Sequence, residues 1–509
     1  MVLLFIGPKS QPPPKWDGAY LASKPNSAND YQTLLRNEFG RLANQTDPTN
    51  ATSLYVAYQL GRPLLIAVFH DGDTQLRRAI IAHAAQMIRG LPTYETVLKA
   101  PAGDTFGRTV DRLAPRLRAT RQQLAGTDPK IDGISMPDEP RLYGFHIFPL
   151  REGDAFRIAT GNIHQFGRYQ STLLRLATAD PALSSDPDIQ RDLRVIAQYL
   201  THDFLRFYWR EAPAWHWNGA FVGGIRERSL ARLNGGPRVA GRRFFSGFLD
   251  YDVHLWAVAA DLKTVQRKSS WLAPSSADKA LVDDVVALAF RVLLERVEVG
   301  ADGKSFAFDR GYWDDNPIAQ YGGCQDARLP KRVCPIKSYT TDISHGQRWP
   351  AWLESFELAA RDRGEAATVR RIRAALAATV ARGIRYREGR LLLPNFLDGR
   401  DGWFLTTEST NGANAHPPSS MTGWAMRYAA YAELSGLEPR IAEAQRRFCD
   451  TIRSSAQADV RFRMAQYGEP EANPANGIRP MRDEYGALTA YASICIMTQN
   501  SAAAFIARP

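Results

Sequence analysis

The chain has 509 residues, 44% of them hydrophobic and 10% aromatic, which is enough for a large core and excludes an intrinsically disordered protein. Its 64 Lys and Arg residues against 53 Asp and Glu residues give a formal net charge of +11. This excess indicates either a polyanionic partner or an arginine-rich composition whose charge is spread evenly. No zinc-finger, RNA-recognition or Walker motif and no long basic run occurs, so we expect no nucleic-acid partner.

The N-terminal stretch MVLLFIGPKSQPPPKWD carries an apolar run that is too short for a complete signal peptide and that lacks a basic start. We interpret residues 1–25 as an N-terminal extension in which a signal peptide is absent or trimmed. No stretch approaches the roughly 18 apolar residues of a membrane span, so no membrane span is expected.

Apolar residues at steps of three and four dominate the rest of the chain and predict helices. In chain order, the predicted helices cover 30–45, 53–72, 74–91, 106–126, 170–179, 188–212, 251–265, 277–297, 349–364, 366–384, 420–436, 440–456 and 481–499. In the first of them Leu34, Leu35, Phe39 and Leu42 form one apolar stripe. Two β-hairpins are predicted, one within 294–313 around an Asp-Gly turn and a weaker one within 386–399.

The fold class predicted from this pattern is mainly α. No linker divides the chain, so we expect residues 26–509 to form a single domain. A dozen or more antiparallel helices exceed what a four-helix bundle can pack, and long loops rich in Trp, Asn, Gly and His disfavour a regular solenoid. We therefore expect an (α/α) toroid, a ring of helical hairpins with a few short β-hairpins and a central cleft.

The four cysteines fall into two groups. Cys324 and Cys334 enclose the polar loop CQDARLPKRVC, whereas Cys449 and Cys495 lie on predicted helices. Their spacing does not match a zinc site, and we expect neither a metal nor another cofactor. A disulfide between Cys324 and Cys334 is expected in an oxidising compartment, and the alternative is two reduced, unrelated thiols.

Five stretches near predicted loops gather side chains suited to catalysis, and they contain five of the nine histidines. They hold, in order, Asn162, His164, Arg168 and Tyr169; Trp215, His216, Trp217 and Asn218; Tyr251, Asp252 and His254; Tyr339, Asp342, His345 and Arg348; and Glu408, Asn411, Asn414 and His416. This concentration indicates a site, although each histidine taken alone is equally well explained as structural.

Histidine, tyrosine, asparagine and arginine together suit one reaction, the β-elimination of a uronic-acid polysaccharide. The C5 proton is poorly acidic, so Asn, His or Arg donors must neutralise the neighbouring carboxylate before charge can develop on it. A Tyr or His then removes the proton and a Tyr or His protonates the leaving oxygen.

In these residue types and in its expected architecture the chain resembles the helical-toroid polysaccharide lyases of the alginate, glucuronan and chondroitin AC type. The alginate group shows adjacent Asn-Asn-His, whereas GNIHQ places Ile163 between Asn162 and His164. WHWN offers His216 and Asn218 instead, and we favour Asn218 as the neutraliser. The resemblance implies an acidic polysaccharide as substrate and a secreted or periplasmic location. The catalytic candidates are His216, Asn218, Tyr251, Tyr339, His345 and Arg348, and the substrate-binding candidates are Asn162, His164, Trp217, His254 and Trp349.

Two alternatives stay open. Helical toroids also host glycoside hydrolases and transglycosylases, which use two carboxylates. The carboxylate candidates are Asp252, Asp314, Asp342, Glu408 and Glu484; Asp314 and its neighbour Asp315 are equally explained by a turn. The other alternative is a non-enzymatic, polyanion-binding helical scaffold. The sequence indicates neither the sugar and linkage nor the oligomeric state.

The stretch SYTTDISHGQRWPAWLESF, residues 338–356, gives the sharpest hypothesis. We expect one helix that lines the cleft, in which Asp342 caps the N-terminus and orients His345. Asp342, His345 and Trp349 would share a face, with Arg348 one step round and Tyr339 close by. Arg348 would bind the substrate carboxylate. The alternative is that Asp342 is only a cap and that His345 and Arg348 form a structural polar pair.

Overall fold

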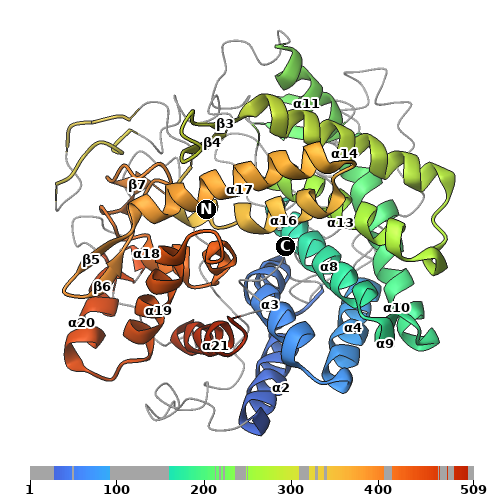
Figure 1. Cartoon of the computed structure of the whole chain (residues 1–509), viewed down its shortest axis with the longest axis horizontal. Coiled ribbons are helices and arrows are strands. Elements are labelled where there is room, and N and C mark those ends of the chain that lie inside the picture. The colour runs from blue at the N-terminus through green and yellow to red at the C-terminus, as the bar shows by residue number, and fades with distance from the viewer. Residues whose placement is uncertain are drawn as a thin grey trace, which may run out of the picture.

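The computed structural model describes residues 28–48, 51–91, 160–211, 214–216, 219–221, 224–235, 248, 250–308, 320–326, 331–336, 341–405, 415–467, 469–470, 478–479 and 487–502. The described part is mainly helical, as predicted (Figure 1). The helices, including the π-helix η1 and the 3₁₀ helices η2 and η4, are α2 (Ala28–Gln45), α3 (Ala51–Asp71), α4 (Thr74–Arg89), α8 (Thr160–Ala179), α9 (Pro181–Ser184), α10 (Pro187–Gln198), η1 (Tyr199–Glu211), α11 (Gly224–Asn234), α13 (Asp250–Lys268), η2 (Ser270–Leu272), α14 (Ser276–Arg296), α15 (Ile343–Gly346), α16 (Trp349–Ala359), α17 (Arg363–Gly383), α18 (Thr422–Met426), η4 (Ala430–Leu434), α19 (Pro439–Arg453), α20 (Gln457–Gln466) and α21 (Ala487–Asn500).

The described strands form five antiparallel pairs and no larger sheet. The pairs are β1 (Ala214–His216) with β2 (Gly219–Phe221), β3 (Val297–Val299) with β4 (Phe306–Phe308), β5 (Arg385–Arg387) with β6 (Arg390–Leu392), β7 (Phe404–Leu405) with β8 (Ala415–His416), and β9 (Glu469–Pro470) with β10 (Ile478–Arg479). Both predicted hairpins are confirmed, as β3–β4 and β5–β6. In the second, Glu388 and Gly389 have φ values of 52° and 79°, as a tight hairpin turn requires.

One series of helices packs side by side through the middle of the molecule. Helix α3 contacts α8, α8 contacts α13, α13 contacts α16, and α16 contacts η4. Helix η4 contacts α19, which contacts α21, and α21 contacts α3 again. Figure 1 shows α21 beside α3, although they come from opposite ends of the described chain. The hydrophobic core is continuous along this series, from Tyr31 to Met497.

A second set of helices packs outside the first. Helix α2 packs on α3, α14 on α13 and α17 on α16. The predicted stripe of α2 is confirmed, with Leu34, Leu35 and Leu42 buried and Phe39 packed against the core. The apolar stripe of α2 therefore packs into the core, as its periodicity predicts.

A layer of paired charges crosses the core. Arg168 on α8 is fully buried and forms an ion pair with Asp261 on α13. Its guanidinium also donates to the Ser355 hydroxyl on α16, at 2.6 Å. Arg62 on α3 forms a hydrogen-bonded ion pair with Glu433 on η4, 371 residues away. Buried charges are tolerated only when paired, so this layer fixes how the inner helices face one another.

Two predicted helices have different bounds or continuity in the structure. Helix α8 begins at Thr160, ten residues before the predicted start, so His164, Arg168 and Tyr169 lie on a helix. The helix predicted over 420–436 is two short pieces, α18 and η4, because Ala429 adopts a left-handed φ of 54° between them. The hairpin β1–β2 was not predicted. The predicted helix 106–126 and the extension 1–25 lie outside the described residues.

Candidate functional site

The stretch 338–356 is not the single helix predicted. Helix α15 ends at Gly346, residues Gln347 and Arg348 form a turn, and α16 begins at Trp349. Pro350 explains the break, because it has no N–H to donate to the Gly346 carbonyl and its ring would collide with that carbonyl in a continuous helix. Proline is instead well placed in the first turn of a new helix.

Asp342 caps α15 and holds His345, as predicted. Its Oδ1 accepts hydrogen bonds from the backbone N–H groups of Ser344 and His345, at 3.0 and 2.9 Å. Its Oδ2 lies 2.6 Å from Nδ1 of His345. The Asp342 side chain is fully buried, whereas that of His345 is 40% exposed. The carboxylate thus holds the Nδ1 nitrogen of a partly exposed ring.

Asp342 is ionised at any pH at which the protein would work. Burial alone would raise its pKa, but the adjacent His345 imidazole and the hydrogen bonds from Ser344 and His345 outweigh burial and lower the pKa to about 2. A carboxylate in this state can accept a hydrogen bond from Nδ1 of His345 and stabilises positive charge beside it.

The backbone around Asp342 is held by a segment that sequence reasoning did not single out. The Ile343 N–H donates to the Asn395 carbonyl at 2.8 Å, and the Leu397 N–H donates to the Thr341 carbonyl at 2.9 Å. The fully buried Asn395 side chain donates to the carbonyls of Gly402 and Pro417 and accepts from the backbone of Met421. Asn395 therefore ties the Asp342 segment to the segment that follows His416.

Tyr431 is a second residue that sequence reasoning missed. Its hydroxyl donates to the Ile343 carbonyl at 2.8 Å, and burial, followed by the charge of Asp342, raises its pKa well above the usual range. A Cβ at Gly346 would lie 2.7 Å from this hydroxyl, so only glycine fits there. No local sequence signal reveals this contact, which joins η4 to α15 across 88 residues.

Arg348 lies in the turn before α16 and forms an ion pair with Asp250, the first residue of α13. Its side chain is 11% exposed and that of Asp250 is 33% exposed. Its predicted role as a carboxylate ligand stays a prediction, and any substrate carboxylate there would share the guanidinium with Asp250.

Two predicted substrate-binding histidines are buried. His164 is 0% exposed and packs against the rings of Phe204 and Tyr208. His254 is 1% exposed, and its Nδ1 accepts a hydrogen bond from the Trp352 indole at 3.1 Å. Burial, reinforced by nearby cations including Arg348, lowers the pKa of His254 well below its usual value, so this ring is neutral.

Other predicted residues lie in the core as well. Trp349 is 4% exposed and packs on Phe306, Phe308 and Trp352, so it does not share an exposed face with His345. Further members of the five stretches are also almost fully buried: Tyr169, which lies 3% exposed in the core; Asp252, which pairs with Arg228; and His416, whose ring meets that of Trp424 edge to face.

Several predicted residues cannot be placed. Tyr339, Trp217 and Asn218 lie outside the described residues, as do Asp314, Asp315, Glu408, Asn411, Asn414 and Glu484. For Asn162, Trp215, His216 and Tyr251 only the backbone is described, on α8, β1 and α13. Within the described ranges no group of His, Cys, Asp and Glu is arranged to hold a metal ion, and no described helix has the length and apolar character needed to cross a membrane.

All four cysteines are paired. The predicted disulfide Cys324–Cys334 is confirmed, and a second joins Cys449 on α19 to Cys495 on α21. The second pair was missed because its members lie 46 residues apart on two helices whose packing the sequence does not reveal.

Comparison with known proteins gives no relative: no protein family, no curated protein and no solved structure matches this chain. The site must therefore be interpreted from its own geometry.

Proposed function

We propose that the chain is a polysaccharide lyase that cleaves a uronate-containing polysaccharide by β-elimination, with His345 as an acid–base residue. The observation that carries this proposal is the Asp342–His345 pair, in which a fully buried carboxylate holds a ring that is 40% exposed. This arrangement suits removal of a weakly acidic proton, because the carboxylate stabilises the imidazolium that forms.

In this proposal His345 Nε2 takes the C5 proton, the electron pair forms the C4–C5 double bond, and the glycosidic oxygen leaves C4 with a proton. Arg348 neutralises the substrate carboxylate while sharing its charge with Asp250. Tyr339, Tyr251 and His216 stay candidates for protonating the leaving oxygen, and Asn218 stays a candidate for the second neutralising donor.

The proposed architecture is a closed (α/α) toroid. It is supported by the sequence of contacts from α3 through α8, α13, α16, η4 and α19 to α21 and back to α3. It is also supported by the outer positions of α2, α14 and α17. The two disulfides fit an oxidising compartment, and we propose a secreted or periplasmic location.

A glycoside hydrolase is less well supported by the described carboxylates. Asp342, with a pKa of about 2, cannot act as a general acid near neutral pH. Asp252 is fully buried against Arg228. Neither forms the pair of accessible carboxyl groups, one protonated and one ionised, that hydrolysis requires.

The test is His345→Ala with acidic polysaccharide as substrate. We expect turnover to fall roughly 100-fold or more, while the protein still folds because Asp342 keeps its hydrogen bonds from Ser344 and from the backbone of residue 345. His202→Ala is the matched control, since His202 on η1 is 46% exposed and lies beside Asp278. Full activity of His345→Ala, or a loss explained by a lower melting temperature, would show that the Asp342–His345 pair is structural.

A further inference from the structure

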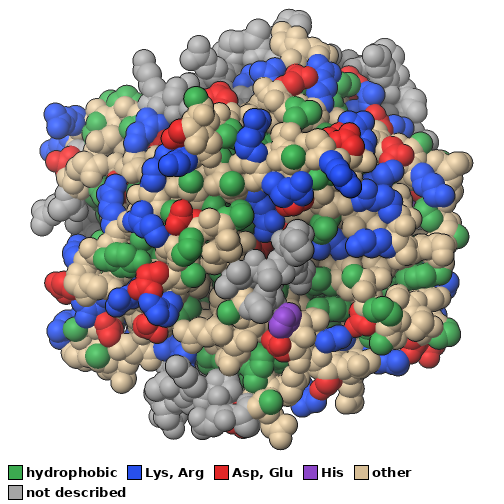
Figure 2. Space-filling model, in the orientation of Figure 1, with side chains coloured by type: hydrophobic (Ala, Val, Ile, Leu, Met, Phe, Trp, Pro, Cys, Tyr) green, Lys and Arg blue, Asp and Glu red, His purple; other side chains and the backbone are tan. Residues whose placement is uncertain are grey.

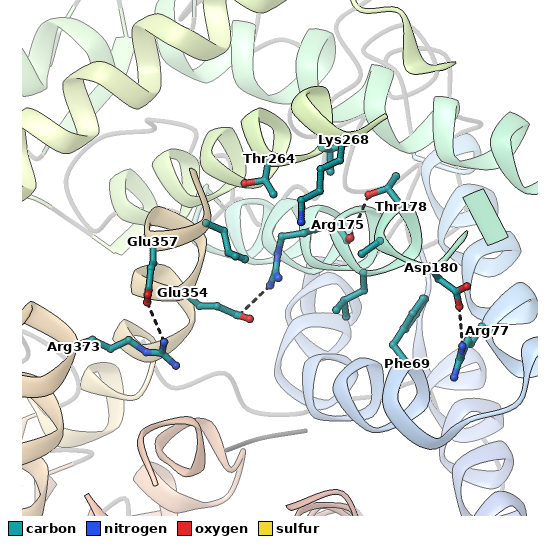
Figure 3. A pocket seen from close by; sticks show the side chains of 14 residues that line it. Phe69, Arg77, Arg175, Thr178, Asp180, Thr264, Lys268, Glu354, Glu357 and Arg373 are labelled. Carbon is teal, nitrogen blue, oxygen red and sulfur yellow. Dashed lines mark hydrogen bonds and ion pairs between the residues drawn. The ribbon is translucent and has the colours of Figure 1, made fainter. Parts of the chain in front are cut away.

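A cluster of charged side chains, separate from the Asp342–His345 and Arg348–Asp250 pairs, lies at the other end of the helices that carry the candidate site. Helix α16 begins beside Arg348 and ends at Ala359, and α13 begins at Asp250 and ends at Lys268. The 11 residues of α16 separate the two ends by about 16 Å. A cavity of about 500 Å³ opens there, lined by residues of α8, α13, α16 and α17 (Figure 3).

Two cations at the end of α13, beside this cavity, have no carboxylate partner among the described residues. Arg267 donates to the backbone carbonyls of Leu358 and Ala360, which are the orphan acceptors at the end of α16. Lys268 is exposed, lines the cavity and extends toward Arg175 in Figure 3. The acids Glu354 and Glu357, which line the cavity with Lys268, are each paired with an arginine instead.

Two ion pairs close to this end of α16 expose the cation and bury the acid. Arg361 is 61% exposed and its partner Glu365 is 8% exposed. Arg370 is 57% exposed and its partner Glu357 is 8% exposed. Asp362 is the exposed acid here, and it caps α17. Solvent therefore meets mainly guanidinium and ammonium groups, and Figure 2 shows Lys and Arg side chains gathered over this part of the molecule.

We propose that this rim, formed by Arg267, Lys268, Arg361 and Arg370 around the end of α16, is a second, non-catalytic binding site for the acidic polysaccharide. The proposal rests on the proposed function for its choice of polymer. The planar guanidinium group of arginine matches a planar carboxylate. A second contact with the same polymer chain raises the local concentration of polymer at the protein.

The distribution of charge favours a polyuronate over a nucleic acid. Nucleic acids carry one phosphate charge for about every 1.7 Å of duplex and are bound by contiguous cations. Here the exposed carboxylate of Asp362 lies between Arg361 and the other cations and repels a dense polyphosphate. A polymer with one carboxylate on each sugar ring has its charges further apart, so each carboxylate can bind one cation.

The experiment uses the triple variant Lys268→Gln, Arg361→Gln, Arg370→Gln in the His345→Ala background, so that polymer is not consumed. The matched control is Arg191→Gln, Arg291→Gln, Arg446→Gln, which removes the same charge. These three arginines are exposed, and their acidic partners are exposed as well, at 79%, 42% and 32%. The probes are polygalacturonate, its trisaccharide and single-stranded DNA.

We expect the triple variant to bind polygalacturonate about 10-fold more weakly, the control to change less than about 2-fold, and trisaccharide binding to be unaffected. Equal weakening by the control would overturn the proposal, because net charge alone would then explain binding. So would an unchanged triple variant, or DNA bound more tightly than polygalacturonate through the same three residues. Failure of the proposed function is observed separately, as the absence of polymer cleavage by the unmutated protein.

Discussion

At the scale of single residues, spacing alone predicted the most informative interaction. Aspartate at a helix start caps the helix, and a histidine three residues later comes within reach of the same carboxylate. The structure has both contacts, from Asp342 to the α15 backbone and to His345. Burial was not predictable in this way: His164 and His254 share helices with apolar residues, and only tertiary packing decides which face is inward.

The buried histidines predict how the fold responds to acid. Burial lowers the pKa of His416 from 6.5 to about 3, with smaller, opposed effects of Asp342 and Arg427. The folded ring therefore stays neutral where the unfolded chain takes up a proton. The resulting stability is complete above about pH 6.5 and is lost as the pH falls toward 3, by about 2 kcal/mol at pH 5 for this residue.

His416→Gln should remove this loss of stability at acidic pH. The measurement is the difference in unfolding free energy between pH 7.5 and pH 5, which we expect to shrink by about 2 kcal/mol relative to the unmutated protein. His202→Gln, at a side chain that is 46% exposed, should leave the difference unchanged. An identical pH dependence in all three proteins would mean that His416 titrates normally in the fold.

At the scale of elements, long periodic helices and both hairpins with strong turn signals were predictable, because local chemistry determines them. The breaks between helices were not predictable. Pro350 sits where a continuous helix would need its N–H, and Ala429 takes a left-handed conformation that nothing in its side chain favours. The turn of α15 further depends on Tyr431 of a distant element.

Gly346 provides the test at this scale. Gly346→Ala places a Cβ within 2.7 Å of the Tyr431 hydroxyl, and we expect it to cost 1–3 kcal/mol, roughly the usual cost of overpacking. Gly40→Ala on α2 is the control, because a Cβ there meets nothing within 4 Å. That change should be neutral or stabilise by about 0.5–1 kcal/mol. Comparable effects of the two changes in urea unfolding would contradict the packing of Tyr431 on α15.

At the scale of the whole molecule, the mainly helical class was predictable from composition and periodicity, but the pairing of helices was not. Arg62 meets Glu433 across 371 residues, and Arg168 reaches α13 and α16 at once. Such contacts depend on the order of helices in space, which amphipathic stripes do not specify. The disulfide Cys449–Cys495 joins α19 to α21, which packs on α3 near the start of the described chain.

The two disulfides should therefore differ in their effect on stability. Cys449 and Cys495 are 46 positions apart, and Cys324 and Cys334 are 10 positions apart. Loop-closure entropy predicts a loss of about 4 kcal/mol for Cys449→Ala with Cys495→Ala, and about 3 kcal/mol for the smaller loop. Because the Cys449–Cys495 disulfide also anchors α21 against the core, removing this disulfide should lower the melting temperature more. The reverse order would contradict that anchoring role.

The central claim is that this molecule breaks uronate polymers by elimination, and the structure of the product tests it most directly. The purified protein is incubated with a panel of acidic polysaccharides, and the fragments are followed by ultraviolet absorbance and mass spectrometry. Elimination would give fragments with a C4–C5 unsaturated uronate at the new non-reducing end, each lighter by one water than a hydrolysis product. Saturated fragments that carry the added water, or no cleavage of any uronate polymer, would contradict it.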